Sequence, residues 1–399
     1  MIPPRGRGGQ VPVPRCAGTV PLLALLLLQS QPAPDLLGLR APKTIWLGEG
    51  PTDLPKHPAG TGTLKAVMLF ARFPDGDQEE TMRALHERLV PDAVAFYEAS
   101  SYGRMTLAVT PHFEWYSMRG PSTAPGYDCS QHDTHMRYVQ EVVDAADADV
   151  DFAGYDLIYV VANQAPGVFN SPTFNAHGGD GFHADKHHIR HAVTFGNDVR
   201  GEDWGWQTLV HETGHVLGLP DLYSYVPADK AYKSYHVHTG SWSPMGFQKH
   251  ARDYLAWHKR KLGWLDDDAF VVVTEGERSA QLTHIRSRGG TKAVVVPTSA
   301  TEALVAEVRH LSDEHPEPGV LVYRVSVATP SGHGPIQVLP ARPDDDAARP
   351  ELARRYVALY DALHRAGDSF VDAAAGVRID VRPGEAGGFR VDVTRSEAR

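Results

Sequence analysis

The chain has 399 residues, of which 42% are hydrophobic and 22% are charged, and its formal net charge is −10. This composition is that of a globular protein with room for one large domain or two modest ones. An acidic chain without a basic stripe argues against nucleic acid as a partner.

The N-terminal residues 1–34 are predicted to be a secretory signal peptide. Three arginines precede a short apolar run at 20–28, and a polar, proline-rich stretch follows it. This order is typical of a signal peptide, and the run is too short for a comfortable membrane span. We therefore expect a secreted, extracellular protein without stable membrane insertion after cleavage. A disordered leader or a misplaced start codon is the alternative.

Two cysteines, Cys16 and Cys129, are present, and the first would leave with the signal peptide. The mature chain would then have no partner for an intramolecular disulfide. Residues 35–62, which are rich in proline and glycine, are predicted to be a linker or a short pro-segment.

From residue 63 to 265, segments with strand and helix patterns alternate. Strands are expected at 64–73, 155–163 and 191–198, and at 104–118 with a break at its proline. Helices are expected at 82–103, 135–152, 206–219 and 251–265. Beyond residue 266 the pattern is mainly that of short valine-rich strands, interrupted by a charged loop and one helix at 342–356. The sequence therefore predicts an α+β domain, 63–265, followed by a β-rich C-terminal subdomain, 266–399.

The segment HETGHVLGLPD, residues 211–221, has the spacing of a metal site. On a helix, His211 and His215 share one face, so both imidazoles can reach one Zn²⁺. Glu212 can then lie beside the metal and act as a general base on a zinc-activated water. Gly218 allows a sharp exit from the helix, and Asp221 can return as the third ligand. The alternative is a helix with surface histidines and a glycine cap.

A methionine turn at 240–247 follows the metal segment. Met245 is expected to pack against the imidazoles from below, because its thioether is soft and adaptable. An ordinary core or loop methionine is the alternative.

The chain resembles the immune inhibitor A-like family of secreted metallopeptidases in the metzincin clan. The resemblance covers roughly residues 64–265 and rests on the segments FYEASSYGRMTLAV, VDFAGYDLIYVV, HETGHVLGLPDLY and SWSPMG, the last followed by LAWHKRKLGWL. It implies a metzincin-like catalytic domain with zinc-dependent endopeptidase activity. It also implies that His211, His215 and Asp221 are the ligands and that Glu212 is the base. Larger relatives carry a calcium loop after the position of Asp156, where this chain continues into a strand.

Several further residues have two interpretations. Tyr223 or Tyr225 is expected to assist the transition state or line a subsite, and structural packing is the alternative for each. Ca²⁺ is a second metal to consider, at Asp75 and Asp77, where a capped turn is the alternative. The histidine-rich segment 177–191 is expected to be either a second metal site or rim of the cleft, or a solvated loop.

These expectations combine into a secreted, monomeric zinc endopeptidase that acts on protein or peptide substrates. Two alternatives remain open at this point. One is a zinc hydrolase with a narrow non-protein or exopeptidase specificity, because the motif specifies metal and base but not substrate. The other is a secreted binding module with a structural zinc, against which the intact Glu212 argues, since a structural site needs no base.

Overall fold

The computed structural model describes residues 37–42, 47–176, 178–184, 186–201, 204–251, 253–385 and 387–396. The predicted signal peptide, His177 and part of the predicted linker or pro-segment lie outside the described residues. Among the described residues, no helix combines the length and the apolar character that a membrane span requires.

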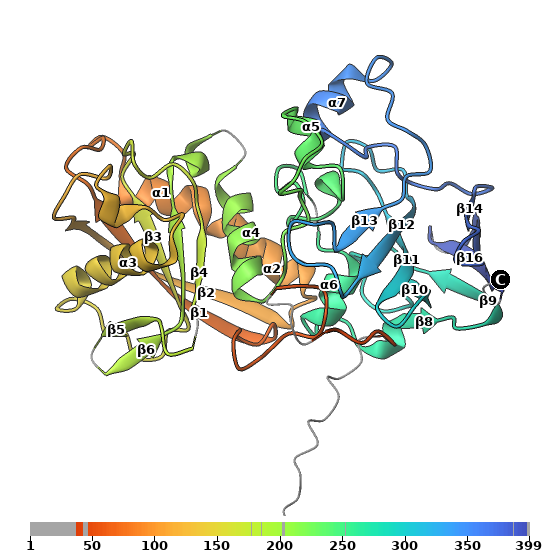
Figure 1. Cartoon of the computed structure of the whole chain (residues 1–399), viewed down its shortest axis with the longest axis horizontal. Coiled ribbons are helices and arrows are strands. Elements are labelled where there is room, and N and C mark those ends of the chain that lie inside the picture. Colours follow the sequence, from red (N-terminus) through yellow and green to blue (C-terminus); the bar gives the residue numbers. More distant parts are fainter. Residues whose placement is uncertain are drawn as a thin grey trace, which may run out of the picture. The chain divides into compact units, whose positions relative to one another are not determined.

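A five-stranded mixed sheet occupies the first part of the fold (Figure 1). Its order is β2-β1-β3-β7-β4, with bounds β1 (Gly62–Arg72), β2 (Met105–Ser117), β3 (Leu157–Ala162), β4 (Thr173–Asn175) and β7 (His191–Phe195). Strands β2, β1, β3 and β7 run parallel to one another. The short β4 pairs antiparallel with β7 at the edge of the sheet. Strands β1, β3 and β7 are almost entirely buried because helices cover both of their faces, whereas β2 at the edge carries polar and partly exposed residues.

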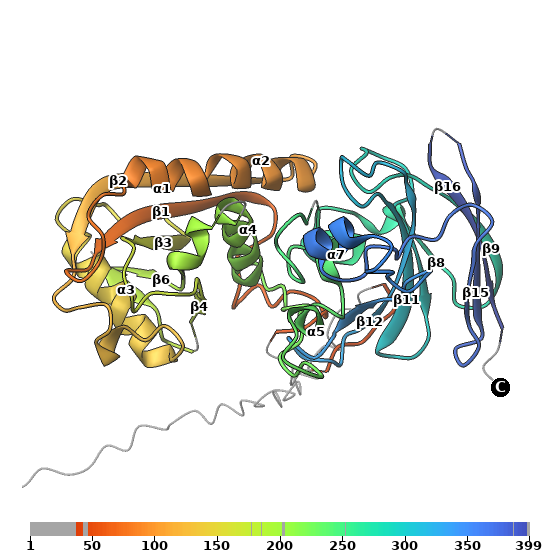
Figure 2. The ribbon, with the colours of Figure 1, turned by 90° about the horizontal axis from the view of Figure 1, so that it is seen from above.

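The two faces of this sheet are covered by different helices. The helices α1 (Met82–Leu89), α2 (Pro91–Ser100) and α4 (Gly205–Val216) share one hydrophobic cluster with Met68 and Phe70 of β1. The helix α3 (His132–Ala146) shares another with Val67 and Leu69. Successive β1 side chains therefore alternate between the two cores, as a strand requires. Figure 2 shows α1 and α2 on one side of the sheet and α3 on the other.

Three sequence expectations differ from the observed elements. The helix expected at 82–103 is two helices, because Pro91 lacks an N–H and starts α2 instead of continuing α1. The strand expected to break at its proline is continuous in β2, where the pairing register with β1 shifts between Met68 and Phe70. Of the helix expected at 251–265, only α6 (Ala256–Lys261) forms, because Leu255 is extended.

Two further sheets follow toward the C-terminus. One has the order β13-β12-β11-β10-β8, with bounds β8 (Phe270–Val272), β10 (Ala293–Pro297), β11 (Glu302–Arg309), β12 (Gly319–Ser326) and β13 (Ile336–Val338). The other has the order β14-β15-β16-β9, with bounds β9 (Gly276–Leu282), β14 (Ser369–Asp372), β15 (Val377–Pro383) and β16 (Phe389–Arg395). Their facing sides form one hydrophobic cluster, which includes Val296 and Ile379.

The remaining elements are short. They comprise the hairpin β5 (Phe182–Ala184) and β6 (His187–Ile189), the helices α5 (Tyr232–Tyr235) and α7 (Pro350–Tyr356), and the 3₁₀ turns at Pro125–Tyr127, Asn197–Arg200, Gly240–Trp242 and Asp267–Ala269.

One core connects the α+β part with the first C-terminal sheet. Val305 and Tyr323 of that sheet belong to the same cluster as Trp257 and Phe70. The N-terminal segment 47–60 is also tied to this core. The buried carboxylate of Glu49 contacts His258 Nε2 at 2.9 Å, and the Glu49 carbonyl accepts a hydrogen bond from Trp257.

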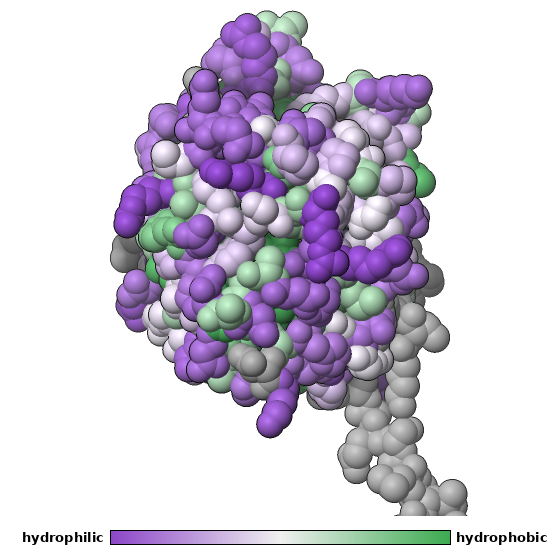
Figure 3. Space-filling model, turned by 90° about the vertical axis from the view of Figure 1, so that its left-hand side faces the viewer, coloured by the Kyte–Doolittle hydropathy of each residue, from purple (hydrophilic) through white to green (hydrophobic). Residues whose placement is uncertain are grey.

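The expected mixed α+β class with a β-rich C-terminal part is confirmed. The finer prediction of a metzincin-like domain and the domain boundaries stay predictions. The face of the molecule in Figure 3 is mostly hydrophilic, with apolar residues scattered over it in small groups.

A buried ion pair between Lys259 and Asp253 gives a test of this packing. Lys259 Nζ donates to Asp253 Oδ2 at 2.7 Å and to the Ser100 carbonyl at the end of α2 at 2.8 Å. Both side chains are at most 3% exposed. Lys259→Met is expected to lower the free energy of unfolding by about 3–5 kcal/mol, because it leaves a buried carboxylate unpaired.

The measurement is urea unfolding followed by circular dichroism. Lys56→Met is the matched control, since the Lys56–Asp53 pair is more than 40% exposed on both sides and should contribute little. A loss below 1 kcal/mol for Lys259→Met would contradict the interpretation.

Candidate metal centre

The helix α4 and the turn after it carry the candidate ligands. All residues of α4 from Gln207 to Val216 are buried, and the His211 and His215 rings lie 4.7 Å apart between centroids. Gly218, with φ +86°, turns the chain back, and its N–H donates to the His215 carbonyl. A Cβ there would also come within 3.3 Å of the His57 ring. Glycine is therefore required at this exit both by conformation and by space.

Three side-chain atoms converge beside α4. His211 Nε2 lies 3.1 Å from Asp221 Oδ1, His215 Nε2 lies 3.2 Å from the same oxygen, and the two nitrogens are 3.2 Å apart. A tetrahedral ion with bonds of about 2.0–2.1 Å places its ligand atoms about 3.3 Å apart. The observed triangle fits that requirement, so this buried group could hold a metal ion.

The hydrogen bonds of the two rings set their tautomers. His211 Nδ1 donates to the Pro244 carbonyl and His215 Nδ1 donates to the Leu219 carbonyl, each at 2.8 Å. Both Nε2 atoms therefore face Asp221 Oδ1, and each is an acceptor there unless its ring is protonated. Three acceptors this close repel one another, so the arrangement requires a positive charge among them.

The pKa values of the ligands follow from the same charges. Burial alone would lower the pKa of His215, but the Asp221 carboxylate outweighs it and raises the pKa to about 9. Burial likewise opposes ionisation of Asp221, yet the two imidazoles hold the pKa of this carboxyl far below its usual range. The two directions are reciprocal, because the Asp221 carboxylate stabilises a positive charge on the imidazoles and that charge stabilises the carboxylate.

Glu212 lies next to this triangle with its two oxygens in different roles. Oε2 accepts a hydrogen bond from Thr173 Oγ1 at 2.7 Å, while Oε1 lies 4.0 Å from His211 Nε2. Burial raises the pKa of Glu212, and the neighbouring imidazoles partly oppose that rise. One oxygen is thus anchored to the edge strand β4, and the other points toward the candidate ligands.

Met245 contacts α4 at Gly214, one of the two glycines of this helix. A Cβ on Gly214 would come within 2.6 Å of Met245 Sδ, so the thioether occupies the space that glycine leaves. Met245 is fully buried, and its carbonyl accepts a hydrogen bond from the Leu222 N–H beside Asp221. The methionine turn therefore contacts both the helix and the returning segment.

The two tyrosines after Asp221 are placed differently. Tyr225 Oη donates to Asp221 Oδ2 at 2.5 Å, and its ring packs over Gly332. Tyr223 lines the cleft, and its ring stacks on His211 with 6.2 Å between centroids. Tyr225 thus orients the candidate third ligand, whereas Tyr223 faces the space in front of the site.

A loop from the C-terminal part, 330–333, holds the backbone of Asp221 by hydrogen bonds. Ser331 Oγ accepts from the Asp221 N–H at 2.9 Å, and the Gly332 N–H donates to the Asp221 carbonyl at 3.0 Å. The Ser331 N–H in turn donates to the Leu47 carbonyl. Three segments that are distant in the sequence therefore meet here, and the contacts of the 330–333 loop hold the backbone of Asp221.

A cleft of about 710 Å³ opens in front of the three ligands. The residues 170–175 along β4 form one wall, and Tyr223, Tyr232 and Tyr235 lie across from it. Thr173 and Ser331 are contributors that the sequence reasoning missed. No local pattern marks either residue, because both reach the site only through long-range packing.

The histidine-rich segment does not join the site as a whole. His183 and His188 stack on each other in the β5–β6 hairpin, while His191 is buried and contacts Asn175. Asn175 in turn donates to the His215 carbonyl, so His191 reaches the centre only indirectly. Among the described residues, the His211, His215 and Asp221 group is the only cluster of three or more side chains with metal-ligand spacing.

The two carboxylates considered for calcium make ordinary loop hydrogen bonds. Asp75 accepts from the N–H and the hydroxyl of Ser122, and Asp77 accepts from the Glu79 N–H two residues on. The Asp77 contact is that of a capped turn, whereas Asp75 joins two loops that are 47 positions apart in the sequence.

Comparisons with known proteins name no family for this chain. No protein-family model matches it, and no curated protein matches it either. The fold and the site define it as a mixed α+β protein with a buried group of two histidines and one aspartate that could hold a metal ion.

Gly214 provides a test of the contact between α4 and Met245. Gly214→Ala is expected to destabilise the protein by about 1–3 kcal/mol, because its Cβ would overlap Met245 Sδ. In a Met245→Ala background, which has its own cavity cost, adding Gly214→Ala should cost less than it does in the wild type, because the overlap is gone. Thermal unfolding of these variants measures this, and equal stability of Gly214→Ala and wild type would contradict it.

Tyr225 provides a test of the orientation of Asp221. Tyr225→Phe is expected to weaken zinc binding about 10–100-fold, because Asp221 loses its hydrogen-bond donor. Competition against a chromogenic chelator measures the affinity. Tyr235→Phe is the matched control, since Tyr235 lines the same cleft whereas the hydrogen bond to Asp221 Oδ2 comes from Tyr225. An equal loss of zinc affinity in the two variants would contradict this role of Tyr225.

Proposed function

We propose that this chain is a secreted zinc-dependent endopeptidase, similar to the immune inhibitor A-like metallopeptidases, that acts as a monomer on protein or peptide substrates. The observation that carries the proposal is the carboxylate of Glu212 beside the convergent Nε2 atoms of His211 and His215 and the carboxylate of Asp221. A structural metal site needs four closed ligands and no base, whereas a catalytic one has three protein ligands and an adjacent carboxylate.

Zinc is the metal that the donor set favours. Two imidazole nitrogens and one carboxylate oxygen in a small triangle suit Zn²⁺, while Ca²⁺ prefers six or more oxygen ligands. When bound, a zinc ion would act as a Lewis acid that polarises a carbonyl and lowers the pKa of water. His211, His215 and Asp221 would hold it.

Glu212 would move the proton in peptide hydrolysis. Its Oε1 accepts a proton from the attacking water as the water oxygen bonds to the carbonyl carbon, and then delivers that proton to the amine nitrogen as the C–N bond breaks. Thr173 keeps Oε2 fixed, so Oε1 is the atom that remains for this task. Burial raises the pKa of Glu212, which brings the carboxyl closer to the range of an effective acid and base.

Tyr223 is the better candidate for assisting the transition state. It lines the cleft, whereas the hydroxyl of Tyr225 is engaged with Asp221. Burial and the nearby Asp221 raise the pKa of Tyr223, so its phenol stays protonated and can donate a hydrogen bond to a developing oxyanion.

The exposed edge of β4 is an argument for a polypeptide as the substrate. The Pro172 carbonyl accepts a hydrogen bond from the Thr194 N–H, and the Ala176 N–H donates one to the Arg190 carbonyl. The backbone groups of Pro172 and Ala176 therefore face β7. The backbone groups of Thr173 and Asn175 consequently point away from the sheet, beside Glu212. An extended peptide can pair with them as an added strand.

The neighbouring surface is apolar in a way that suits peptide binding. Tyr225, Val226, Tyr232, Tyr235 and Val237 are all exposed within one short segment next to the cleft. Concentrations of exposed apolar side chains beside a polar centre are typical of binding sites.

Casein cleavage by the purified zinc-loaded chain tests the proposal. Glu212→Gln keeps the size of the side chain and removes the base, so kcat should fall about 10²–10⁴-fold while zinc remains bound. A zinc chelator should abolish cleavage, and added zinc should restore it. Mass spectrometry of the native protein confirms the metal content of each sample. Undiminished cleavage by Glu212→Gln, or none by the folded, zinc-loaded wild type, would reject the proposal.

A further inference from the structure

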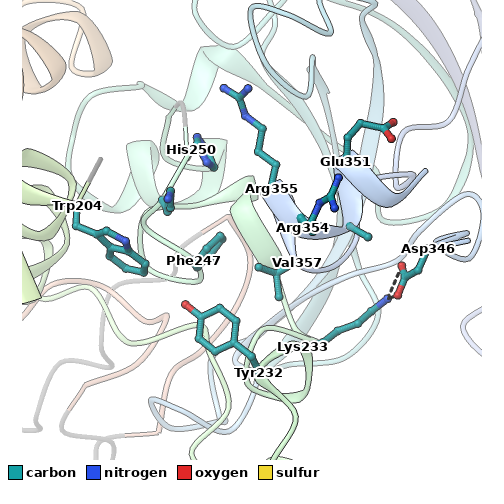
Figure 4. A pocket seen from close by; sticks show the side chains of 12 residues that line it. Trp204, Tyr232, Lys233, Phe247, His250, Asp346, Glu351, Arg354, Arg355 and Val357 are labelled. Carbon is teal, nitrogen blue, oxygen red and sulfur yellow. Dashed lines mark hydrogen bonds and ion pairs between the residues drawn. The ribbon is translucent and has the colours of Figure 1, made fainter. Parts of the chain in front are cut away.

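A second cavity, of about 780 Å³, borders the cleft of the candidate metal centre. Trp204 and Tyr232 line both spaces, so these two aromatic side chains form the border between them. Figure 4 shows their rings close to Phe247, with the charged side chains of Arg354 and Arg355 farther along the cavity. A bound chain that leaves the cleft past Trp204 would therefore enter a charged environment.

The described lining of this second cavity has an excess of positive charge, although the chain as a whole is acidic. Its charged side chains are Lys233, Lys249, Arg354 and Arg355 against Asp346 and Glu351, with His250 in addition. Two of the cations have ion-pair partners, because Lys233 contacts Asp346 at 3.0 Å and Arg355 contacts Glu314 at 3.0 Å.

Arg354 and Lys249 carry further positive charge in the lining. Arg354 is exposed and has no ion-pair partner among the described residues. Lys249 lies over the Trp204 ring, 6.0 Å from its centroid, at the border with the cleft. An anionic group in the cavity would therefore meet guanidinium and ammonium donors without having to displace a carboxylate from Arg354.

We propose that this cavity is a specificity subsite that receives an acidic side chain of the substrate polypeptide. The inference rests on the proposed endopeptidase function and adds a substrate class to it. The aromatic border would contact the residues between the scissile bond and the acidic one, and the basic lining would select the charge.

The direction of the bound chain follows from β4 and α4. Thr173 contacts Glu212 and Asn175 contacts His215, so β4 runs in the same direction as α4. A substrate that pairs antiparallel to β4, the commoner arrangement, runs toward the N-terminal end of α4, where Trp204 lies. The acidic residue is then on the carboxyl-terminal side of the scissile bond.

The length of α4 also gives the distance between the cleaved bond and the acidic residue. Trp204 precedes His211 by seven positions, which corresponds to about 10 Å along α4 at about 1.5 Å per residue. An extended peptide covers that length in about three residues. The acidic side chain should therefore be the second to fourth residue after the cleaved bond.

The experiment uses internally quenched peptides with one common sequence and Glu, Gln or Lys at each of those three positions. Mass spectrometry of the products identifies the cleaved bond, so that only peptides cut at the same place are compared. At one or more positions, kcat/KM should be about three- to tenfold higher for Glu than for Lys, and the ratio should shrink as salt is added.

Two charge reversals locate the effect. Arg354→Glu should lower the Glu-to-Lys ratio at least about threefold, because it replaces the cation in the lining by an anion. Arg137→Glu on α3 makes the same change of net charge outside both cavities and should leave the ratio unchanged. Binding of labelled Glu and Lys peptides to zinc-loaded Glu212→Gln, followed by fluorescence anisotropy, should show the same preference without turnover.

The outcomes separate the two proposals. Cleavage with equal kcat/KM for Glu and Lys at all three positions would overturn the subsite and leave the endopeptidase function standing. The same holds if Arg354→Glu and Arg137→Glu change the ratio equally. Absence of cleavage of every peptide by the zinc-loaded chain would overturn the proposed function, and the subsite with it.

Discussion

The repulsion among three buried hydrogen-bond acceptors is the constraint on which the rest of this structure depends. His211 Nε2, His215 Nε2 and Asp221 Oδ1 lie 3.1–3.2 Å from one another, because backbone carbonyls at both Nδ1 atoms hold the rings with Nε2 toward the carboxylate, and all three atoms are acceptors unless a proton or a metal ion lies among them. Such a group is unfavourable unless a cation neutralises it. The surrounding packing keeps the three atoms together in spite of that cost.

Several other features have their physical reason in this constraint. Gly218 reverses the chain so that Asp221 reaches the imidazoles, and Gly214 admits the Met245 side chain against the helix that carries them. The methionine turn supplies the Pro244 carbonyl that orients His211. The loop at Ser331 holds the backbone of Asp221, while Tyr225 holds its second oxygen. Each contact removes a freedom that would let the acceptors move apart.

The sequence predicted the parts of this arrangement that depend on local geometry. Helical spacing places His211 and His215 on one face, and a glycine before Asp221 indicates a sharp exit, so the convergence of the three residues could be expected. The alternation of apolar strands and amphipathic helices likewise predicted the α+β class. The identity of the metal, the catalytic activity and the domain boundaries were also predicted from the sequence, and they stay predictions.

The contributions that come from distant segments could not be predicted. Thr173 reaches Glu212 from an edge strand of three residues, and Ser331 reaches Asp221 across 110 positions of sequence. Neither has a periodic pattern or a fixed offset from the metal segment. Pro91 shows a different limit, because a proline within an apolar helical pattern can kink one helix or begin another, and only the packing decides.

The contact between Asp221 and the loop at 330–333 also has a consequence for folding order. The loop lies between β12 and β13, so Asp221 gains its backbone partners only after the first C-terminal sheet has formed. Contacts between residues so distant in sequence form late, because a long chain must be closed first. A nascent chain that has completed only the N-terminal sheet would thus hold its third ligand loosely. The full set of contacts around Asp221 would therefore be complete only when the segment up to the loop at 330–333 has folded onto the N-terminal part.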